Sequence, residues 1–449
     1  MSLQSLQIAQ ARAATLLGID IKELDKLQVK EVHKLGDVVL HGKSYPALRA
    51  YTGPKGKIGK GGIRFAEYPS LEAGIEVVRE LSGEMYAKLM LRNHRNFRGA
   101  KGLVLIDAWK LSAEEKSEVA RQFEALMDNA GLSGYNKDVP AGDVGTNGLA
   151  DDYAKAYATQ HPTDPYRSAV ITGKSPAFGG LGARAGATGL GAFTAQKTVM
   201  HANGQTQGTV AMQGFGNAGS WFAYYAASDP DKTIRIQAIG EREGVLWTSD
   251  PEGLPITRNI VLKIGDNSQW TGLKLEALAQ MIRAEKPGID LQIDDDPAGI
   301  FTYAADYFVP AAMGDVLNGE NVKTLGARIG INEIANGPTT ADAHQYLVQS
   351  GKIVIPDFLS NSGGVDTSVT EWQADIDLAE GRIAQLPADH EVEEAQRQST
   401  AALTREILQM ADRLETTDLR VAAAAVTLTR IHQKPKKAPR SRQAVATTA

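Results

Sequence analysis

Hydrophobic residues recur at helical spacing in three stretches of the N-terminal third of the chain. Residues 1–35 carry Leu, Ile and Ala at this spacing and are predicted to be helical. Leu71–Met90 has a strong amphipathic pattern that Ser70 can cap, and Ser112–Asn129 follows with acidic residues in its first turn, where the helix dipole favours them. Short apolar runs predict strands at Val38–Leu40, Ala47–Tyr51 and Gly102–Ile106.

Beyond about residue 185, short apolar segments alternate with helix-compatible ones. The predicted strands are Thr209–Gln213, Ile234–Ile239, Tyr307–Pro310, Ile329–Ile331 and Ile353–Ile355. The predicted helices between them include Ser220–Ala227, Lys274–Ala284 and Thr340–Gln349. Such alternation implies a parallel, doubly wound sheet. From about residue 366 to 432 the pattern returns to long helices, ending in the alanine-rich stretch Leu419–Ile431.

Composition limits the classes of protein to consider. A chain of 449 residues exceeds the size of a single core, so two domains are expected. The net charge of −5 gives no reason to expect nucleic acid or an acidic membrane surface as a partner. The absence of cysteine excludes disulfides, thiolate zinc sites and cysteine nucleophiles. The eight histidines show no metal-ligand spacing, so no metal is expected.

The two ends of the chain bear on localisation. The first 20 residues lack the basic and continuous apolar regions of a secretory signal, and no segment has the roughly 18 apolar residues of a membrane span. A cytoplasmic enzyme is therefore expected. Residues 433–449 are basic, contain proline and are poor in apolar residues, which predicts a disordered, solvated tail rather than a nucleic-acid-binding arm.

A glycine-rich turn joins the strand Thr209–Gln213 to the helix that follows it. Its residues are Gly214, Phe215, Gly216, Asn217, Ala218 and Gly219. Between a strand and a helix, such glycines allow a tight turn and close approach of a pyrophosphate to the helix N-terminus, although the turn alone also fits an α/β protein without nucleotide. Glu241 lies 22 residues further on, where an acidic residue that binds the adenosine ribose is expected. Its carboxylate favours NAD, but Arg242 beside it could accept the phosphate of NADP, so both cofactors stay open.

Three lysines of the N-terminal half lie in glycine-rich or apolar settings: Lys60, Lys88 and Lys101. Small or apolar neighbours remove water from an ammonium, which lowers its pKa and suits it to carbonyl chemistry. The loop of residues 138–145 then presents two carboxylates. Taken singly, each lysine is more often a solvated surface charge.

Taken together and in order, these motifs closely resemble the glutamate/leucine/phenylalanine/valine dehydrogenase family. The resemblance extends from about residue 50 to 432. Its landmarks are KGGIRF (60–65), GAKG (99–102), DVPAGDVGTN (138–147), TGK (172–174), ATG (187–189), QGFGNAG (213–219), NGPTT (336–340) and PDFLSNSGGV (356–365).

The resemblance implies roles for individual residues. Lys101 matches the catalytic lysine that hydrogen-bonds the substrate carbonyl and the attacking water or ammonia. Asp143 matches the carboxylate that moves protons to and from the amino nitrogen. Lys88 matches the lysine that binds the substrate α-carboxylate. Lys60 matches the lysine that binds the side-chain carboxylate of glutamate, and Ser368 matches its helper.

The resemblance also implies the cofactor side and the architecture. Arg184 and Thr188 match the loop that reaches the nicotinamide, and Asn336 matches the asparagine that contacts the nicotinamide ribose. The expected fold is α/β with an N-terminal substrate-binding and oligomerisation domain (1–185) and a Rossmann-like NAD(P)-binding domain (186–365). Helices 366–432 return to the first domain, and 433–449 form the tail. A homohexamer built through the first domain is expected.

The chemistry of oxidative deamination fits these residues. A hydride leaves most readily from a neutral amine, so a base such as Asp143 must take a proton from the ammonium. Charge that develops on the carbinolamine oxygen needs a nearby cation, which Lys101 supplies. Family members that act on branched-chain or aromatic amino acids have an apolar residue in place of Lys60, since an unpaired lysine penalises an apolar side chain. A lysine at this position therefore favours glutamate and 2-oxoglutarate as substrates. The alternatives are a dehydrogenase for another amino acid and an inactive nucleotide-binding protein.

Three departures from the family pattern motivate those alternatives. Arg98 replaces the first glycine of the family's GGAKGG, and one extra residue lies between Lys88 and Lys101, where it could bulge the loop. Gly186 replaces the glutamate of the family's NEATG, which predicts a missing interaction at the domain hinge. The poorly matching span 255–300 is expected to pack its own helix against the nucleotide domain.

Overall fold

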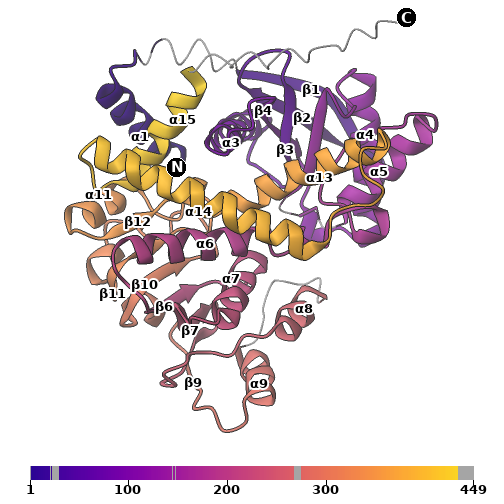
Figure 1. Cartoon of the computed structure of the whole chain (residues 1–449). Helices are drawn as coiled ribbons and strands as arrows, with labels where there is room; N and C mark the ends of the chain where they lie inside the picture. Colours follow the sequence, from indigo (N-terminus) through magenta and orange to yellow (C-terminus); the bar gives the residue numbers. More distant parts are fainter. Residues whose placement is uncertain are drawn as a thin grey trace, which may run out of the picture.

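The structure, a computed structural model, describes residues 2–20, 22, 30–143, 145, 146, 148–266 and 275–432. Within these residues the chain forms two β-sheets, one of five strands and one of seven, with helices packed around both (Figure 1). The sheets lie inside the predicted ranges 1–185 and 186–365, and the α/β prediction with two sheets is confirmed. The boundaries at 185 and 365 themselves stay predictions.

The first sheet has the strand order β1-β2-β4-β3-β5. Its strands are β1 (Lys30–Leu40), β2 (Lys43–Thr52), β3 (Ile58–Phe65), β4 (Phe97–Val104) and β5 (Asp138–Gly142). β1, β2 and β4 pair antiparallel, whereas β3 runs parallel to both β4 and β5. Parallel pairing places β3 between β4 and β5, so that Lys60 of β3, Lys101 of β4 and Asp143 after β5 come from neighbouring strands.

Helices cover both faces of this sheet. They are α3 (Leu71–Leu91), α4 (Ala113–Asn129), α5 (Leu149–Gln160) and the short 3-10 helix η1 (Ala108–Lys110). The Ser70 side chain caps α3, as predicted, by accepting the backbone N–H of Ala73. Gly99 on β4 lets α3 approach closely, because a Cβ there would lie 2.1 Å from the carbonyl oxygen of Ser82.

The prediction of helix through residue 35 is wrong in its second part. Helix α1 spans Ser2–Leu17, and the chain is a β-strand from Lys30 onwards. The register runs from Lys30 opposite Thr52 to Leu40 opposite Lys43, so β1 and β2 form one long hairpin. Pairing with the next strand of the chain overrides the local helical spacing. Residues 21 and 23–29 lie outside the described part.

The second sheet has the order β12-β11-β10-β6-β7-β8-β9. Its strands are β6 (Gly208–Gln213), β7 (Ile234–Glu241), β8 (Gly244–Trp247), β9 (Gln292–Asp294), β10 (Ala305–Pro310), β11 (Ala327–Asn332) and β12 (Ile353–Ile355). The strands from β12 to β7 are parallel, as predicted, but β8 and β9 pair antiparallel. The sheet is therefore mixed. β8 returns through the two-residue turn Arg242-Glu243, which the pattern did not distinguish from a loop.

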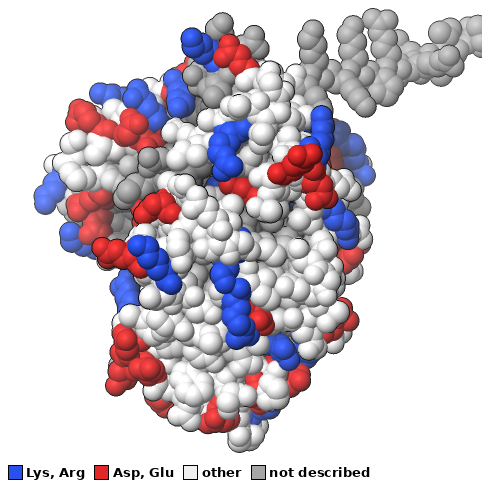
Figure 2. All heavy atoms as spheres, turned by 90° about the vertical axis from the view of Figure 1, so that its left-hand side faces the viewer, with Lys and Arg blue, Asp and Glu red and all other residues white. Residues whose placement is uncertain are grey.

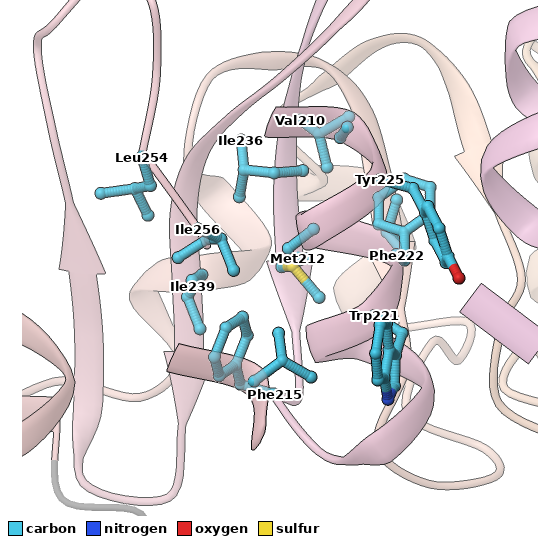
Figure 3. Close-up of a cluster of buried hydrophobic side chains, with 14 of the residues drawn as sticks. Val210, Met212, Phe215, Trp221, Phe222, Tyr225, Ile236, Ile239, Leu254 and Ile256 are labelled. Atoms are coloured by element: carbon cyan, nitrogen blue, oxygen red, sulfur yellow. The ribbon is translucent and has the colours of Figure 1, made fainter. Parts of the chain in front are cut away.

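Helices also surround this second sheet, and α7 contributes several side chains to its main core. The helices are α6 (Ala187–Ala202), α7 (Asn217–Ser228), α8 (Arg258–Asp266), α9 (Leu275–Glu285), α10 (Gly299–Thr302), α11 (Ala341–Gln349) and α12 (Asp357–Ser360), with 3-10 helices η2 (Pro176–Phe178), η3 (Gly182–Arg184) and η4 (Asn321–Thr324). Figure 3 shows Trp221 and Phe222 of α7 beside Met212 of β6. Leu278 and Ile282 of α9 join the same core, so a helix of the span 255–300 packs against this sheet as predicted.

Three C-terminal helices return to the first part of the chain. They are α13 (Gly363–Ala379), α14 (Asp389–Arg413) and α15 (Leu419–His432). α14 lies along α6, while α15 packs against α1 and α3 (Figure 1). The predicted tail, 433–449, lies outside the described residues.

Charge on the surface is mixed. On the face in Figure 2, acidic and basic side chains are interspersed. In the described residues, no helix is both long and apolar enough for a membrane span.

Candidate active site

Residues from three neighbouring strands form the centre of the candidate site. Lys60 lies on β3, Lys101 on β4, and Asp143 directly after β5. The Lys101 ammonium is 2.6 Å from Oδ2 of Asp143. Burial lowers the pKa of Lys101, and the attraction of Asp143 only partly opposes this. A buried ammonium beside a carboxylate provides both the cation and the base that carbonyl–amine chemistry requires.

Arg64 is a second cation on the same carboxylate, and sequence reasoning does not single it out. Its Nε donates to Oδ2 of Asp143 at 2.8 Å. Although burial alone would raise it, Lys101 and Arg64 together hold the pKa of Asp143 well below its usual range. The signal was present, because the two-residue period of a strand places Lys60, Gly62 and Arg64 on one face of KGGIRF. Gly62 makes room there, since a Cβ on it would lie 2.9 Å from Cβ of Asp143.

The prediction of a loop over residues 138–145 is wrong for its first part, because Asp138–Gly142 form strand β5, and the other carboxylate of this segment is structural. Asp138 is buried and accepts hydrogen bonds from Nε and Nη2 of Arg49 at 2.8 and 2.5 Å. It also accepts the hydroxyl of Tyr51 at 2.5 Å. Its acceptor capacity is therefore used within the sheet, and Asp143 is the carboxylate of this segment that pairs with Lys101.

Lys60 is only 2% exposed, yet it contacts only neutral oxygens. Its Nζ donates to the carbonyl of Val139 at 3.2 Å and to the hydroxyl of Thr172. Burial lowers the pKa of Lys60 to about 7, against the opposing attraction of Glu371. Among the described residues no carboxylate forms an ion pair with this ammonium, which leaves its charge available to a ligand.

Arg184 and Ser368 lie together near Lys60. Nε of Arg184 donates to Oγ of Ser368 at 3.0 Å, and the charge of Arg184 is close enough to Lys60 to lower its pKa. Gly364 leaves space for this loop, because a Cβ there would lie 2.8 Å from Oγ1 of Thr188 and 3.3 Å from Nη1 of Arg184. Arg184, which is predicted to lie on the nicotinamide side, is thus also next to Ser368, which is predicted to bind the substrate.

Lys88 reaches across to the second sheet. Its Nζ donates to Oδ1 of Asn336 at 2.8 Å, and Asn361 donates to the same oxygen at 2.9 Å. The residue predicted to hold the substrate α-carboxylate therefore meets the residue predicted to contact the nicotinamide ribose. This contact brings the substrate and cofactor sides of the site together.

The glycine turn after β6 fits a dinucleotide. Gly214 has φ 94°, and a Cβ on it would lie 2.8 Å from Cβ of Ala312. A Cβ on Gly219 would lie 2.4 Å from the carbonyl oxygen of Gly214, so α7 starts as close to the strand as glycine permits. A Cβ on Gly216, in contrast, would meet nothing within 4 Å. That open side belongs to a hollow of about 570 Å³ that Gly214, Gly216 and Glu241 help to line.

The other residues of the turn hold its shape. The Phe215 side chain is buried in the core of Figure 3, and its backbone N–H donates to Oε1 of Glu241. Burial raises the pKa of Glu241, which this hydrogen bond opposes. Asn217 donates to the carbonyl of Ala185, which joins the turn to the 182–188 loop, and Ala218 packs on the core. An open glycine turn at a helix N-terminus with an acidic residue on the next strand is the arrangement that binds NAD(P).

Arg98 is accommodated by neighbours on the far side of its strand. Its guanidinium stacks 3.8 Å over the ring of Tyr51 and pairs with Glu31 at 3.1 Å. Its pairing thus involves Glu31 and Tyr51 rather than Asp143. The substitution leaves the pairing of Lys101 with Asp143 intact.

Gly186 and the segment between Lys88 and Lys101 each lie beside a contact to a C-terminal helix. A Cβ at Gly186 would lie 2.5 Å from the hydroxyl of Tyr225, which donates to Glu393 of α14 at 3.0 Å. A tyrosine–glutamate contact thus joins α7 to α14 at this predicted hinge. In the segment between α3 and β4, where the extra residue is predicted, Nε2 of His94 lies 2.9 Å from Oδ1 of Asp366 of α13.

Sequence profiles identify the family. The profile for Glutamate/Leucine/Phenylalanine/Valine dehydrogenase matches residues 179–438, and that for the Glu/Leu/Phe/Val dehydrogenase dimerisation domain matches residues 44–157. The chain belongs to this family. It is therefore a member of the NAD(P)-dependent amino-acid dehydrogenases, as its motifs predict.

Individual relatives agree with this assignment. The chain is 32% identical over 326 residues to the NADP(+)-dependent glutamate dehydrogenase of Pyrobaculum calidifontis, covering 70% of this chain and 69% of that one. It is 29% identical over 382 residues to the NADP-specific glutamate dehydrogenase of Saccharolobus shibatae, covering 80% of each. Its fold matches the hetero-hexameric glutamate dehydrogenase of Thermus thermophilus with a TM-score of 0.76 and 25% identity, covering 96% of this chain and 95% of that one.

Proposed function

We propose that the protein catalyses the reversible, NAD(P)-dependent oxidative deamination of L-glutamate to 2-oxoglutarate and ammonia. The observation that carries this proposal is Lys60, a buried ammonium without a carboxylate partner among the described residues. Burying a charge is costly unless it is paired. The γ-carboxylate of glutamate supplies that pair, whereas an apolar side chain would leave the lysine unpaired and be rejected.

The neighbouring residues extend this carboxylate site. Ser368 offers a hydroxyl, and Arg184, which contacts it, brings a second cation to the same side of the cleft. Lys88 on α3 then binds the α-carboxylate by exchanging its contact with Asn336 for the substrate. Cations at two ends of the site select a dicarboxylic amino acid.

The reacting groups lie between these two ends. NAD(P), held by the glycine turn and Glu241, would supply the nicotinamide that takes a hydride from Cα of the amino acid and returns it in the reverse reaction. Asp143 takes the proton from the substrate ammonium before that transfer, and Lys101 stabilises the negative charge on the oxygen of the carbinolamine as water adds to the imine. Burial of Lys101 strengthens this stabilisation, because little water competes for its ammonium.

The proposal covers cofactor, assembly and location more broadly. Glu241 favours NAD and Arg242 could hold the phosphate of NADP, while the two relatives named above are NADP enzymes. The preference for NAD that the sequence suggested is therefore unsupported, and we propose NAD(P) without preference. The match to a dimerisation domain supports an oligomer, for which we propose a homohexamer, in the cytoplasm.

One assay tests the proposal. The oxidation of NADH and NADPH is followed with ammonia and a panel of 2-oxo acids that includes 2-oxoglutarate, 2-oxovalerate, 2-oxoisocaproate and phenylpyruvate. We expect the highest kcat/KM for 2-oxoglutarate. Activity confined to the apolar acids would replace glutamate with another amino acid, and inactivity with every acid despite cofactor binding would identify a protein that only binds nucleotide.

A further inference from the structure

Two cations share one oxygen of the candidate base. Nε of Arg64 donates to Oδ2 of Asp143 at 2.8 Å, and Nζ of Lys101 lies 2.6 Å from that same oxygen. On its other side, Nη1 of Arg64 donates to the hydroxyl of Tyr68 at 3.5 Å. Arg64 is thus fixed at both ends, and no role assigned so far uses it.

The second oxygen of Asp143 is open. Within the described part of the chain, Oδ1 has no hydrogen-bond partner, and the side chain is 20% exposed. An oxygen that accepts a proton from the substrate nitrogen must be free to approach it. Oδ1 is the oxygen that meets this condition.

Lys101 cannot hold the carboxylate in place throughout the reaction. When its ammonium turns to the substrate oxygen, a carboxylate held by that ammonium alone would follow it or rotate about its own side-chain bonds. A guanidinium anchored elsewhere prevents this, because its planar set of N–H donors is rigid. Small displacements of a catalytic group reduce the rate strongly.

We propose that Arg64 is a positioning residue for the reaction: it anchors Oδ2 of Asp143, so that Oδ1 stays aimed at the substrate nitrogen while Lys101 moves to the substrate oxygen. The proposal rests on the proposed function, since the roles of Lys101 and Asp143 do. The charged groups that act on Lys101 are Asp143 after β5, Arg64 on β3 and Glu84 on α3, and Tyr68 lies beyond Arg64.

A labelling experiment tests this arrangement without turnover. Reaction of Lys101 with trace acetic anhydride is followed against pH by peptide mass spectrometry in the wild type, Arg64→Gln, Tyr68→Phe and Arg121→Gln. Removing the neighbouring cation leaves Lys101 in a one-to-one pair with Asp143, so we expect its labelling midpoint in Arg64→Gln to rise by about one pH unit. Arg121 is a half-exposed residue of α4 paired with Glu118, and its variant serves as the matched control.

Kinetics supply the second readout. With 2-oxoglutarate and ammonia we expect Arg64→Gln to lower kcat by about a hundredfold while KM changes little, because the base is misplaced but the carboxylate sites are intact. Arg64→Lys should recover part of kcat, and Tyr68→Phe should lower it less than Arg64→Gln. If Arg64 had a purely structural role, Arg64→Gln would lower the melting temperature but would not lower kcat selectively while leaving KM unchanged.

The outcomes separate this inference from the proposed function. A wild type inactive with every 2-oxo acid overturns the proposed function, and the labelling midpoint then decides the role of Arg64 in holding Asp143. An active wild type, with unchanged midpoint and kcat in Arg64→Gln, overturns the inference alone. If Arg64→Gln does not fold, Arg64→Lys and Tyr68→Phe take its place. The inference is overturned if both of these variants keep the labelling midpoint and the kcat of the wild type.

Discussion

Two buried lysines meet at the segment 171–174 and have opposite surroundings: Lys60 contacts Thr172 of this segment, and Lys174 belongs to it. Lys60 contacts the hydroxyl of Thr172 and backbone carbonyls, whereas Lys174 contacts Glu371 and Asp375, each at 2.8 Å. Burial lowers the pKa of Lys60 to about 7. Although burial opposes it, the two carboxylates raise the pKa of Lys174 above its usual value.

The difference shows how to separate a structural charge from a binding charge. Lys174 is neutralised within the protein and ties the loop before η2 to α13. Lys60 is equally buried, but the fold supplies only neutral oxygens to its ammonium. A buried charge that the protein leaves unpaired is a place where a ligand of opposite charge gains most. The comparison therefore supports the proposal that Lys60, and not Lys174, selects the substrate.

Replacing Lys60 should have the largest effect on activity. In Lys60→Leu the γ-carboxylate loses its cation, so kcat/KM for glutamate should fall by about a thousandfold while that for norvaline or methionine is spared or rises. Steady-state kinetics with each amino acid and saturating cofactor measure this. Unchanged turnover of glutamate would remove Lys60 from the specificity site.

Replacing Lys174 should instead affect stability. Lys174→Met leaves Glu371 and Asp375 buried without their cation, which should lower the free energy of unfolding by about 3 kcal/mol. Lys60→Met removes an unpaired buried charge and should cost far less. Urea unfolding measures the free energy of unfolding of both variants. Equal losses of stability would mean that Lys60 and Lys174 do not differ in how the protein neutralises their charge.

The affinity for 2-oxoglutarate should depend on pH in a direction set by Lys60. Its pKa in the folded protein, about 7, lies below the usual 10.5, so the ammonium is present below pH 7 and lost as pH rises through that value. KM for 2-oxoglutarate should therefore increase by up to about tenfold per pH unit above 7. In Lys60→Leu, KM for 2-oxovalerate should lack this rise, and its persistence there would assign the titration to another group.

The smallest expected effect concerns the cofactor. Glu241 accepts the backbone N–H of Phe215 beside the hollow of the glycine turn, where a 2′-phosphate would meet its negative charge. Glu241→Gln should raise the ratio of kcat/KM for NADPH to that for NADH by about fivefold, which corresponds to roughly 1 kcal/mol of repulsion. A ratio that does not change would place the adenosine ribose elsewhere in the hollow.

The sequence predicted the elements whose signals are local. The helical period and a capping serine located α3, and strand–turn–helix order located the glycine turn between β6 and α7. It failed where pairing with another strand, rather than local spacing, decides the structure. Lys30–Leu40 has mixed local spacing and becomes a strand by pairing with β2, and β8 is defined by its pairing with β7.

The site shows the same limit. Motif order marked Lys101, Asp143 and Lys60, but it could not show that Arg64 and Lys101 share one oxygen of Asp143. Nor could it show that Ser368 hydrogen-bonds Arg184, which lies 184 positions earlier. Such contacts depend on the packing of distant segments rather than on spacing along the chain.

Proton uptake on binding tests the central claim most directly. Isothermal titration calorimetry of the wild type with saturating NADPH and no ammonia, at pH 8 in buffers of different ionisation enthalpy, counts the protons taken up with each ligand. If the unpaired Lys60 receives the distal carboxylate, 2-oxoglutarate should take up close to one proton and 2-oxovalerate close to none. The same uptake with both acids, or none with 2-oxoglutarate, would contradict the assignment of Lys60 as the cation that selects glutamate.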